Sequence, residues 1–380
     1  MTDPINRRRL FRTAALAGAA AAAPAGVLAQ PRPPASKAPP QLVQPDGGYA
    51  GVPLRRPDIR ASAVQTALMN VTVANAAQDL RRNLAHVIDQ IDATVGYFGE
   101  KDLVTFNSFA LHGWDNWTKK DLETIALRVP GPQSDAICAK AKEYNCYIAF
   151  GGYVIDPDWP GHVIDMYFLA GPKGEIVSRQ WKAATLRSQR ATADFFVTHA
   201  VDVMDAFVER YGWDELLPVA RTDIGNIALS SQFRDNELFR ALAFKGAEIF
   251  VRSGLGGFTD ADGELTARVN RVFTLYMSNA LSPGNPRYFP DNGYLGGTSI
   301  YGLRGEKLAT SDKHEAAVNA TLGIAARRAA GLIPDVTWDL YRHVYDQYQS
   351  RFAPNAYARR IPDSIKDASD LMRSVRRWKA

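Results

Sequence analysis

The stretch DMYFLAGPKGEIVSRQWK, residues 165–182, gives the clearest local structural signal in the chain. Its beginning is mostly apolar and predicts a strand over residues 165–170, and the Gly-Pro-Lys-Gly run at 171–174 predicts a turn. Residues 175–181 then predict a strand that returns antiparallel to the first. A β-hairpin therefore stands near the middle of the sequence, and the segments on both sides of it decide the class of the fold.

Helices and strands alternate on both sides of this hairpin. Residues 76–97 carry apolar side chains at spacings of three and four, which predicts an amphipathic helix packed on a sheet. The other predicted helices cover residues 121–143, 202–211, 237–245 and 268–278, and the other predicted strands cover residues 62–68, 102–106, 147–150, 224–229, 247–252, 297–301 and 316–322. Two glycines, Gly151 and Gly152, are expected to end the strand before them. This alternation predicts an α/β layered domain with a mixed sheet.

The two ends of the chain differ from this middle part. Arg8 and Arg9 precede an Ala-rich apolar run, so residues 1–29 are predicted to be an export signal of the twin-arginine type. The alternative is an alanine-rich membrane anchor, which the short run and its low Leu and Ile content disfavour. Residues 30–59, rich in Pro and Gly, are predicted to be a linker, and residues 331–380 a C-terminal extension that wraps a neighbouring subunit or the core.

Export would place the mature chain in the periplasm or outside the cell, with no stable membrane anchor after signal cleavage.

Composition bears on the state of the cysteines and on the class of partner. The two cysteines, Cys138 and Cys146, are interpreted as buried free thiols, with a disulfide as the alternative. The net charge of +5 lies largely at the chain ends, which favours solvated tails over nucleic-acid or membrane contact. No basic stretch interleaves with aromatic residues, so no nucleic-acid partner is predicted. The histidines lack metal-ligand spacing and no phosphate loop is present, so neither metal nor cofactor is predicted.

Short segments follow one another in a recognisable order: residues 63–65, 102–106, 174–182, 218–228, 237–240 with 245–249, and 296–300. In this order and spacing they resemble the nitrilase or carbon–nitrogen hydrolase superfamily in its aliphatic-amidase-like branch. The resemblance implies a four-layer α-β-β-α sandwich, assigned here to residues 60–330, and a homo-oligomer that stacks sandwiches through helices.

The resemblance also implies where the chemistry would take place. In this family a glutamate acts as the base, a lysine stabilises the oxyanion, and a cysteine attacks the amide or nitrile carbon. The glutamate position holds Ser108, and the lysine position holds Lys182, for which a partly buried, ion-paired structural lysine is the alternative. The cysteine position holds Ser230 or Ser231, depending on the direction of alignment.

The two replacements predict that standard Cys-dependent amidase or nitrilase chemistry has been lost. Without neighbouring carboxylates, Lys182 predicts a positive pocket that binds a small anionic or polar ligand, such as a carboxylate or an amide. His112, Trp114 and Gln232 are the candidate ligand-binding residues. A surface cluster of aromatic residues with Trp117 is the alternative for the first two.

Two other functions remain compatible with the sequence. The first is a carbon–nitrogen hydrolase with altered chemistry, in which Lys182 is base or electrophile and Ser230 or Ser231 is the nucleophile. The second is an ordinary amidase whose catalytic residues lie elsewhere, although no cysteine follows the predicted strand at 224–229.

Overall fold

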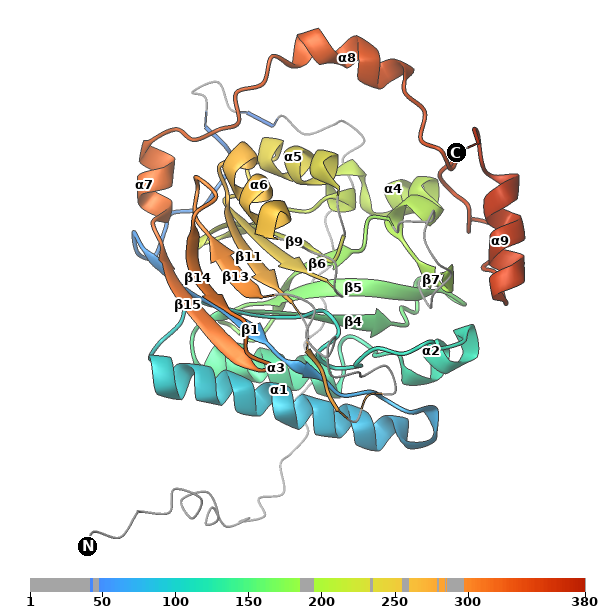
Figure 1. Ribbon diagram of the computed structural model, residues 1–380, viewed down its shortest axis with the longest axis horizontal. Helices are drawn as coiled ribbons and strands as arrows, with labels where there is room; N and C mark the ends of the chain where they lie inside the picture. Colours follow the sequence, from blue (N-terminus) through green and yellow to red (C-terminus); the bar gives the residue numbers. More distant parts are fainter. Residues whose placement is uncertain are drawn as a thin grey trace, which may run out of the picture. The chain divides into compact units, whose positions relative to one another are not determined.

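Two mixed β-sheets form the centre of the domain, and helices cover the outer face of each sheet (Figure 1). The computed structural model describes residues 42–43, 48–184, 195–232, 235–254, 260–278, 280–283, 285 and 297–379. The predicted export signal lies outside the described residues, as does part of the predicted linker.

The first sheet contains the predicted hairpin. In order across the sheet, its strands are β15 (Ala316–Leu322), β1 (Ile59–Gln65), β3 (Leu103–Phe106), β4 (Tyr147–Val154), β5 (Val163–Ala170) and β6 (Ile176–Trp181), with β7 (Val197–Thr198) paired beside β5. Strands β1, β3 and β4 are parallel, whereas β5 runs antiparallel to both β4 and β6. The carboxyl ends of β3, β4 and β6 therefore lie at one edge, together with the start of β5.

The second sheet has a parallel centre as well. Its order is β14 (Lys307–Ser311), β13 (Thr298–Tyr301), β11 (Phe273–Met277), β10 (Ile249–Ser253), β9 (Gly225–Ser230) and β8 (Ala220–Thr222). Strands β9, β10 and β11 are parallel, so their carboxyl ends also share one edge. Two short strands, β2 (Ala67–Leu68) and β12 (Ala280–Leu281), pair separately.

Helices form the two outer layers. The first sheet is covered by α1 (Ala76–Phe98) and α3 (Pro132–Glu143), and the second by α5 (Asn236–Phe244) and α6 (Asp260–Asn270) (Figure 1). The remaining helices are α2 (Lys119–Ile125), α4 (Met204–Tyr211), α7 (Ile324–Ala329), α8 (Trp338–Gln347) and α9 (Ile365–Ser374), and 3₁₀ turns cover Val73–Asn75, Ala200–Val203 and Trp213–Leu216.

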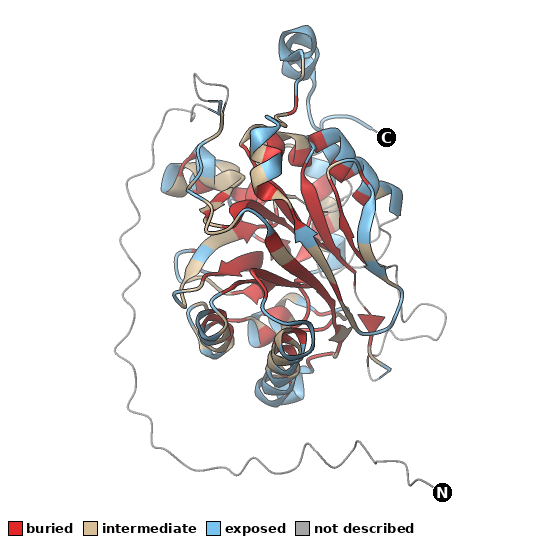
Figure 2. Ribbon diagram, turned by 90° about the vertical axis from the view of Figure 1, so that its left-hand side faces the viewer, coloured by how far each residue is buried: buried red, intermediate tan, exposed pale blue. Residues whose placement is uncertain are grey.

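Apolar clusters fill the spaces between these layers. Along β3, Val104 and Phe106 belong to the cluster packed under α1 and α3, whereas Leu103 belongs to the cluster between the sheets. A further cluster joins Phe239 of α5 to Phe250 of β10. Figure 2 shows that both sheets consist mainly of buried residues. Because successive residues of a strand face opposite sides, a sheet covered on both faces needs apolar residues at nearly every position of its strands. The predicted four-layer α-β-β-α sandwich is confirmed.

Two predicted helices were wrong. The helix predicted over residues 121–143 is two helices, α2 and α3, because Pro130 precedes a new helix start at Pro132, where a proline is favoured. The helix predicted over residues 268–278 is the end of α6 followed by β11. Arg271 has a φ of 51°, which ends α6, and the aromatic residues that follow pair with β10 and β13.

The strand predicted to stop before Gly151 and Gly152 instead continues through both as β4. These glycines allow close approach of other segments. A Cβ atom at Gly151 would lie 2.9 Å from Ser108 Cβ, and one at Gly152 would lie 2.6 Å from His112 Cε1. Both separations are shorter than van der Waals contact, so the glycines let the segment after β3 lie directly on β4.

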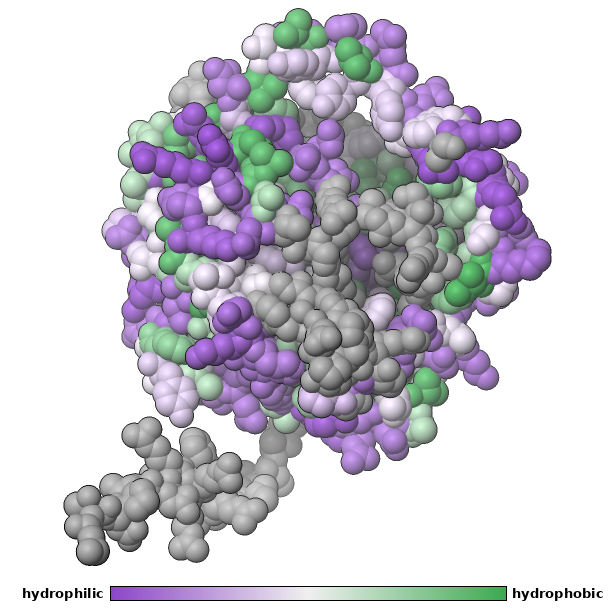
Figure 3. Space-filling model, viewed as in Figure 1, coloured by the Kyte–Doolittle hydropathy of each residue, from purple (hydrophilic) through white to green (hydrophobic). Residues whose placement is uncertain are grey.

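Parts of both chain ends lie against the sandwich. In the predicted linker, Arg55 donates its backbone N–H to the carbonyl of Asp223 at 2.8 Å. In the C-terminal extension, Tyr357 donates its backbone N–H to the carbonyl of Asp202 at 3.0 Å, so this part packs on the chain's own core. Helix α8 buries no residue, and apolar side chains are exposed on it at the top of Figure 3. Among the described helices, none combines the length and hydropathy needed to cross a membrane.

Candidate functional site

Several polar side chains lie at the edge where the parallel strands end. Ser108 follows β3, Lys182 follows β6, Ser231 follows β9, and Ser253 is the last residue of β10. All four are buried. Since ligands of layered α/β proteins bind beyond the carboxyl ends of the strands, this edge is the candidate site.

Lys182 forms an ion pair that the sequence did not predict. Its Nζ lies 3.5 Å from Asp165 Oδ2, and the two side chains are only 10% and 1% exposed. Its backbone N–H also donates to the carbonyl of Asp165 at 2.9 Å, which extends the β5–β6 pairing by one residue. The expectation that Lys182 has no neighbouring carboxylate was wrong, and with it the basis for a positive pocket. The observed pair matches the alternative of a buried, ion-paired lysine at the family position.

The serines after β9 differ in what they contact. Ser230 Oγ accepts a hydrogen bond from the backbone N–H of Gln232 at 3.0 Å. Ser231 Oγ instead lies 3.5 Å from Asp165 Oδ2, at the outer limit of a hydrogen bond. Of the two candidates for the cysteine position, Ser231 is therefore the one directed at the carboxylate that pairs with Lys182.

Gln232 connects this segment to the lysine. Its Oε1 accepts a hydrogen bond from the backbone N–H of Ala184 at 3.1 Å, two residues beyond Lys182. The side chain is buried. This contact holds the end of β9 against the chain that follows β6, which is a positioning role for a residue predicted to bind ligand.

Ser108, at the glutamate position, forms hydrogen bonds with a residue of the second sheet. Its Oγ accepts a hydrogen bond from Ser253 Oγ at 2.9 Å, and its backbone N–H donates to the same hydroxyl oxygen at 2.7 Å. The preceding residue, Asn107, donates from Nδ2 to the carbonyl of Gly254 at 3.0 Å. These bonds join β3 to β10 across the sandwich. Neither hydroxyl is a base at neutral pH.

The aromatic residues after Ser108 are not a surface cluster. His112 is fully buried, and its Nε2 lies 3.1 Å from the carbonyl oxygen of Ile125. Burial lowers the pKa of His112 to about 4, so its ring is neutral at pH 7. Trp117 is also buried and donates from Nε1 to the carbonyl of Val71, whereas Trp114 is half-buried. The contacts of His112 and Trp117 are those of core residues.

The helix after the site has its own N-terminal cap. Helix α5 begins at Asn236, and the carboxylate of Asp235 accepts the backbone N–H of Leu238 at 2.9 Å. Burial raises the pKa of Asp235. This acidic cap accepts one N–H at the positive N-terminal end of α5. In a nucleophile elbow, that end of the helix favours an anionic nucleophile.

The two cysteines lie elsewhere in the fold. Cys138, on α3, and Cys146, before β4, are free thiols in the cluster under the first sheet. Burial raises the pKa of each thiol to about 12. Neither is therefore a reactive thiolate at neutral pH. The described residues include no group of three or more histidine, cysteine or acidic side chains placed to hold a metal ion.

The hairpin register places Asp165 opposite Lys182, but the sequence alone did not reveal this register. Met166 pairs with Trp181, so the next position pairs Asp165 with Lys182. A register shift between Leu169 and Ala170 displaces the pairing by one residue. Counting back from the turn without this bulge places Asp165 opposite the wrong residue, and a slip of one residue reverses which face each side chain takes.

Sequence comparison finds a matching family profile and several relatives. The family profile described as carbon-nitrogen hydrolase matches residues 60–328. A formamidase of Bacillus cereus (strain AH820) is 24% identical over 280 residues, which cover 69% of this chain and 77% of that protein. A formamidase of Helicobacter acinonychis (strain Sheeba) is 24% identical over 204 residues, which cover 53% of this chain and 55% of that protein.

Solved structures with the same fold belong to the same group. A carbon–nitrogen hydrolase of Helicobacter pylori G27 superimposes with a TM-score of 0.59 at 14% identity, covering 77% of this chain and 100% of that one. An amidase of Nesterenkonia sp. superimposes with a TM-score of 0.53 at 14% identity, covering 77% of this chain and 98% of that one. Because the profile spans both sheets of the sandwich, the chain belongs to the carbon–nitrogen hydrolase family of the nitrilase superfamily.

Proposed function

We propose that this protein binds a small polar ligand at the edge where the strands end and does not carry out Cys-dependent amidase or nitrilase chemistry. The observation that carries the proposal is the buried Lys182–Asp165 pair, with the Ser231 hydroxyl beside it. A buried ion pair with nearby hydroxyls is a costly arrangement for stability alone, so its presence at the family's catalytic position supports a binding role.

The loss of thiol chemistry follows from what replaces it. No thiol lies at the site, since both cysteines are in the cluster under the first sheet. The hydroxyl of Ser108 is bonded to Ser253 and cannot accept a proton as a carboxylate would. Ser230 is bonded to the backbone. A cysteine, a base and a lysine act as one unit, so removal of two of the three abolishes nearly all of the rate enhancement.

A hydrolase with Ser–Lys chemistry is the second candidate, favoured by the contact between Ser231 and Asp165. A lysine must be neutral to take a proton from serine. In the structure Lys182 Nζ is paired with the Asp165 carboxylate at 3.5 Å, an ion pair that a lysine acting as the base would have to give up. Binding is therefore the better supported function. A serine-directed fluorophosphonate probe distinguishes the two, because covalent labelling of Ser231 would support the hydrolase.

The relatives guide the choice of ligands. Two of them are named formamidases, which supports formamide and acetamide as probes.

We further propose that the protein acts outside the cytoplasm as a homo-oligomer. Arg8, Arg9 and the apolar run that follows support export. Cell fractionation with and without an Arg8→Lys, Arg9→Lys change tests that part.

Isothermal titration calorimetry with formamide, acetamide, propionamide and acetate tests the binding function. Wild-type protein is expected to bind at least one of them, and Lys182→Met is expected to weaken that binding at least about tenfold, the effect of losing a charged hydrogen bond. The matched control is Lys140→Met on α3, in the helix layer outside the first sheet, where the lysine pairs with Asp92. Equal binding by wild type and Lys182→Met would contradict a site at Lys182.

A further inference from the structure

Helix α8 exposes an apolar face. Each residue of Trp338–Gln347 is exposed, although the Trp338 ring also packs edge-on against Phe244 at the end of α5. At about 100° per residue, six large side chains fall on one side of the helix, and they are Trp338, Leu340, Tyr341, Val344, Tyr345 and Tyr348. The charged residues Asp339, Arg342 and Asp346 take the other side. An amphipathic helix of this kind is stable when its apolar face is covered.

The chain end that lies beside α8 is strongly basic. Residues 349–352 follow the helix and lie against residues 375–378. Arg377 donates its backbone N–H to the carbonyl of Arg351 at 2.8 Å, and Trp378 Nε1 donates to the carbonyl of Gln349 at 3.0 Å. These bonds hold the chain end at the C-terminal end of α8. Residues 349–379 contain eight lysines and arginines but only three aspartates.

The aspartates of this segment do not neutralise that excess. Each forms an ion pair with a lysine or arginine: Asp363 with Lys119, Asp367 with Arg360, and Asp370 with Lys366 and Arg373. Four exposed basic residues of the segment form no ion pair within the described part of the chain, and they are Arg359, Arg376, Arg377 and Lys379. Since the last three belong to the chain end beside α8, the surface there is positive.

We propose that α8 and the basic chain end form one surface that docks on a membrane containing anionic lipid. The apolar face of α8 lies among the lipid headgroups, parallel to the membrane, and Arg376, Arg377 and Lys379 contact the headgroup phosphates. Tryptophan and tyrosine suit this depth, because their rings are apolar and each carries one polar group. The attachment is peripheral and reversible, so it needs no membrane-spanning segment. It is also independent of the ligand site at Lys182.

The charge of this surface favours lipid over a second copy of the chain. Most dimers of identical chains are two-fold symmetric, so the same surface patch on each copy meets its equivalent. Contact through α8 and the chain end would bring the two basic segments together, and like charges in an interface oppose association. Anionic headgroups instead attract each lysine and arginine near the membrane surface.

Flotation of the full chain with lipid vesicles tests the proposal. Wild-type protein is expected to float with vesicles of equal parts phosphatidylglycerol and phosphatidylcholine, and at least about tenfold less with phosphatidylcholine alone. The double change Leu340→Asn, Val344→Asn alters side chains that are 61% and 57% exposed, so it should weaken binding at least about tenfold and leave the thermal midpoint unchanged. The double change Arg376→Gln, Arg377→Gln should also weaken binding at least about tenfold.

Matched controls separate this surface from the rest of the molecule. Leu265→Asn, exposed on α6, and Arg81→Gln, exposed on α1, should bind vesicles as the wild type does. Binding that persists in both double variants would come from another part of the chain, such as residues 1–29, and would overturn the inference. Absence of wild-type binding to the mixed vesicles would also overturn it. If the α8 variant then dissociated an oligomer in sedimentation velocity, a second copy would be what covers the helix.

Discussion

Asp165 and Lys182 are joined twice, once through their backbones at 2.9 Å and once through their side chains at 3.5 Å. The backbone hydrogen bond determines the side-chain contact, because the β5–β6 register brings the two side chains to one face of the sheet. The last backbone bond of a hairpin thus positions the charged pair at the family's catalytic edge.

This pairing predicts a stability coupling. Lys182→Met removes the ammonium that lies 3.5 Å from the buried Asp165 carboxylate and is expected to lower the free energy of unfolding by about 3 kcal/mol. Combining it with Asp165→Asn removes the leftover charge, so the double variant should be more stable than Lys182→Met alone. Urea unfolding of the wild type, both single variants and the double variant measures the coupling. Additive losses would show that the two charges do not interact.

Gly152 is predicted to be irreplaceable in β4. In Gly152→Ala the new methyl group would meet the His112 ring at 2.6 Å, so overpacking should cost about 1–3 kcal/mol of unfolding free energy. Gly96→Ala is the control, because no atom lies within 4 Å of a Cβ there and alanine is the better helix former in α1. Thermal unfolding should therefore shift in opposite directions for the two variants. A neutral Gly152→Ala would mean that His112 does not lie against β4.

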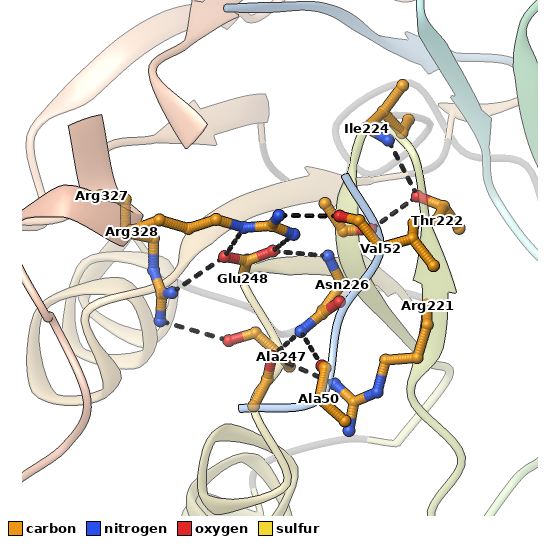
Figure 4. A network of polar contacts seen from close by, with 12 residues as sticks. Ala50, Val52, Arg221, Thr222, Ile224, Asn226, Ala247, Glu248, Arg327 and Arg328 are labelled. Carbon is orange, nitrogen blue, oxygen red and sulfur yellow. Dashed lines mark hydrogen bonds and ion pairs between the residues drawn. The ribbon is translucent and has the colours of Figure 1, made fainter. Parts of the chain in front are cut away.

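A buried network fixes the opposite end of the second sheet (Figure 4). Glu248 accepts two hydrogen bonds from Arg328, at 2.9 and 2.8 Å, and one from the backbone of Asn226 at 2.8 Å, while Arg327 lies 3.5 Å away. Glu248→Gln leaves two arginines without their carboxylate, so the free energy of unfolding should fall by about 3 kcal/mol. The control Glu237→Gln, at an exposed position of α5, should change it by less than about 0.5 kcal/mol. Equal urea midpoints would contradict this role for Glu248.

His112 predicts a pH dependence of stability. Its pKa is lowered by burial to about 4, whereas an unfolded histidine has a value near 6.5. The unfolded chain therefore binds the proton first, and the contribution is fully present above pH 6.5 and is lost as the pH falls toward 4, by about 3 kcal/mol in all. In His112→Gln the fall in unfolding free energy over this window should be smaller by that amount. His343→Gln, at an exposed position of α8, should follow the wild type. If His112→Gln kept the full wild-type slope, His112 would not be the group responsible.

The layered fold could be read from the sequence because its strands are short, apolar and in family order. The helix over residues 76–97 was confirmed as α1, and the hairpin was confirmed as β5 and β6. The sequence failed where long-range pairing overrides local spacing. Residues 273–277 are predicted as part of a helix, but their pairing with β10 and β13 makes them a strand.

The resemblance predicts Ser108, Lys182 and either Ser230 or Ser231 at the catalytic positions. All four lie at or just after the carboxyl ends of β3, β6 and β9. Asp165 was missed because an acidic residue at the start of an apolar strand carries no local sign of its partner. Only the bulge in β5–β6 pairing places it opposite Lys182.

Ammonia release from formamide and acetamide tests the central claim most directly. Purified wild-type protein at pH 7 is predicted to release ammonia no faster than Lys182→Met or Ser231→Ala, and no faster than the buffer alone. Ammonia released by wild type well above the buffer rate, and abolished by both variants, would contradict the loss of hydrolysis and establish an enzyme with altered chemistry.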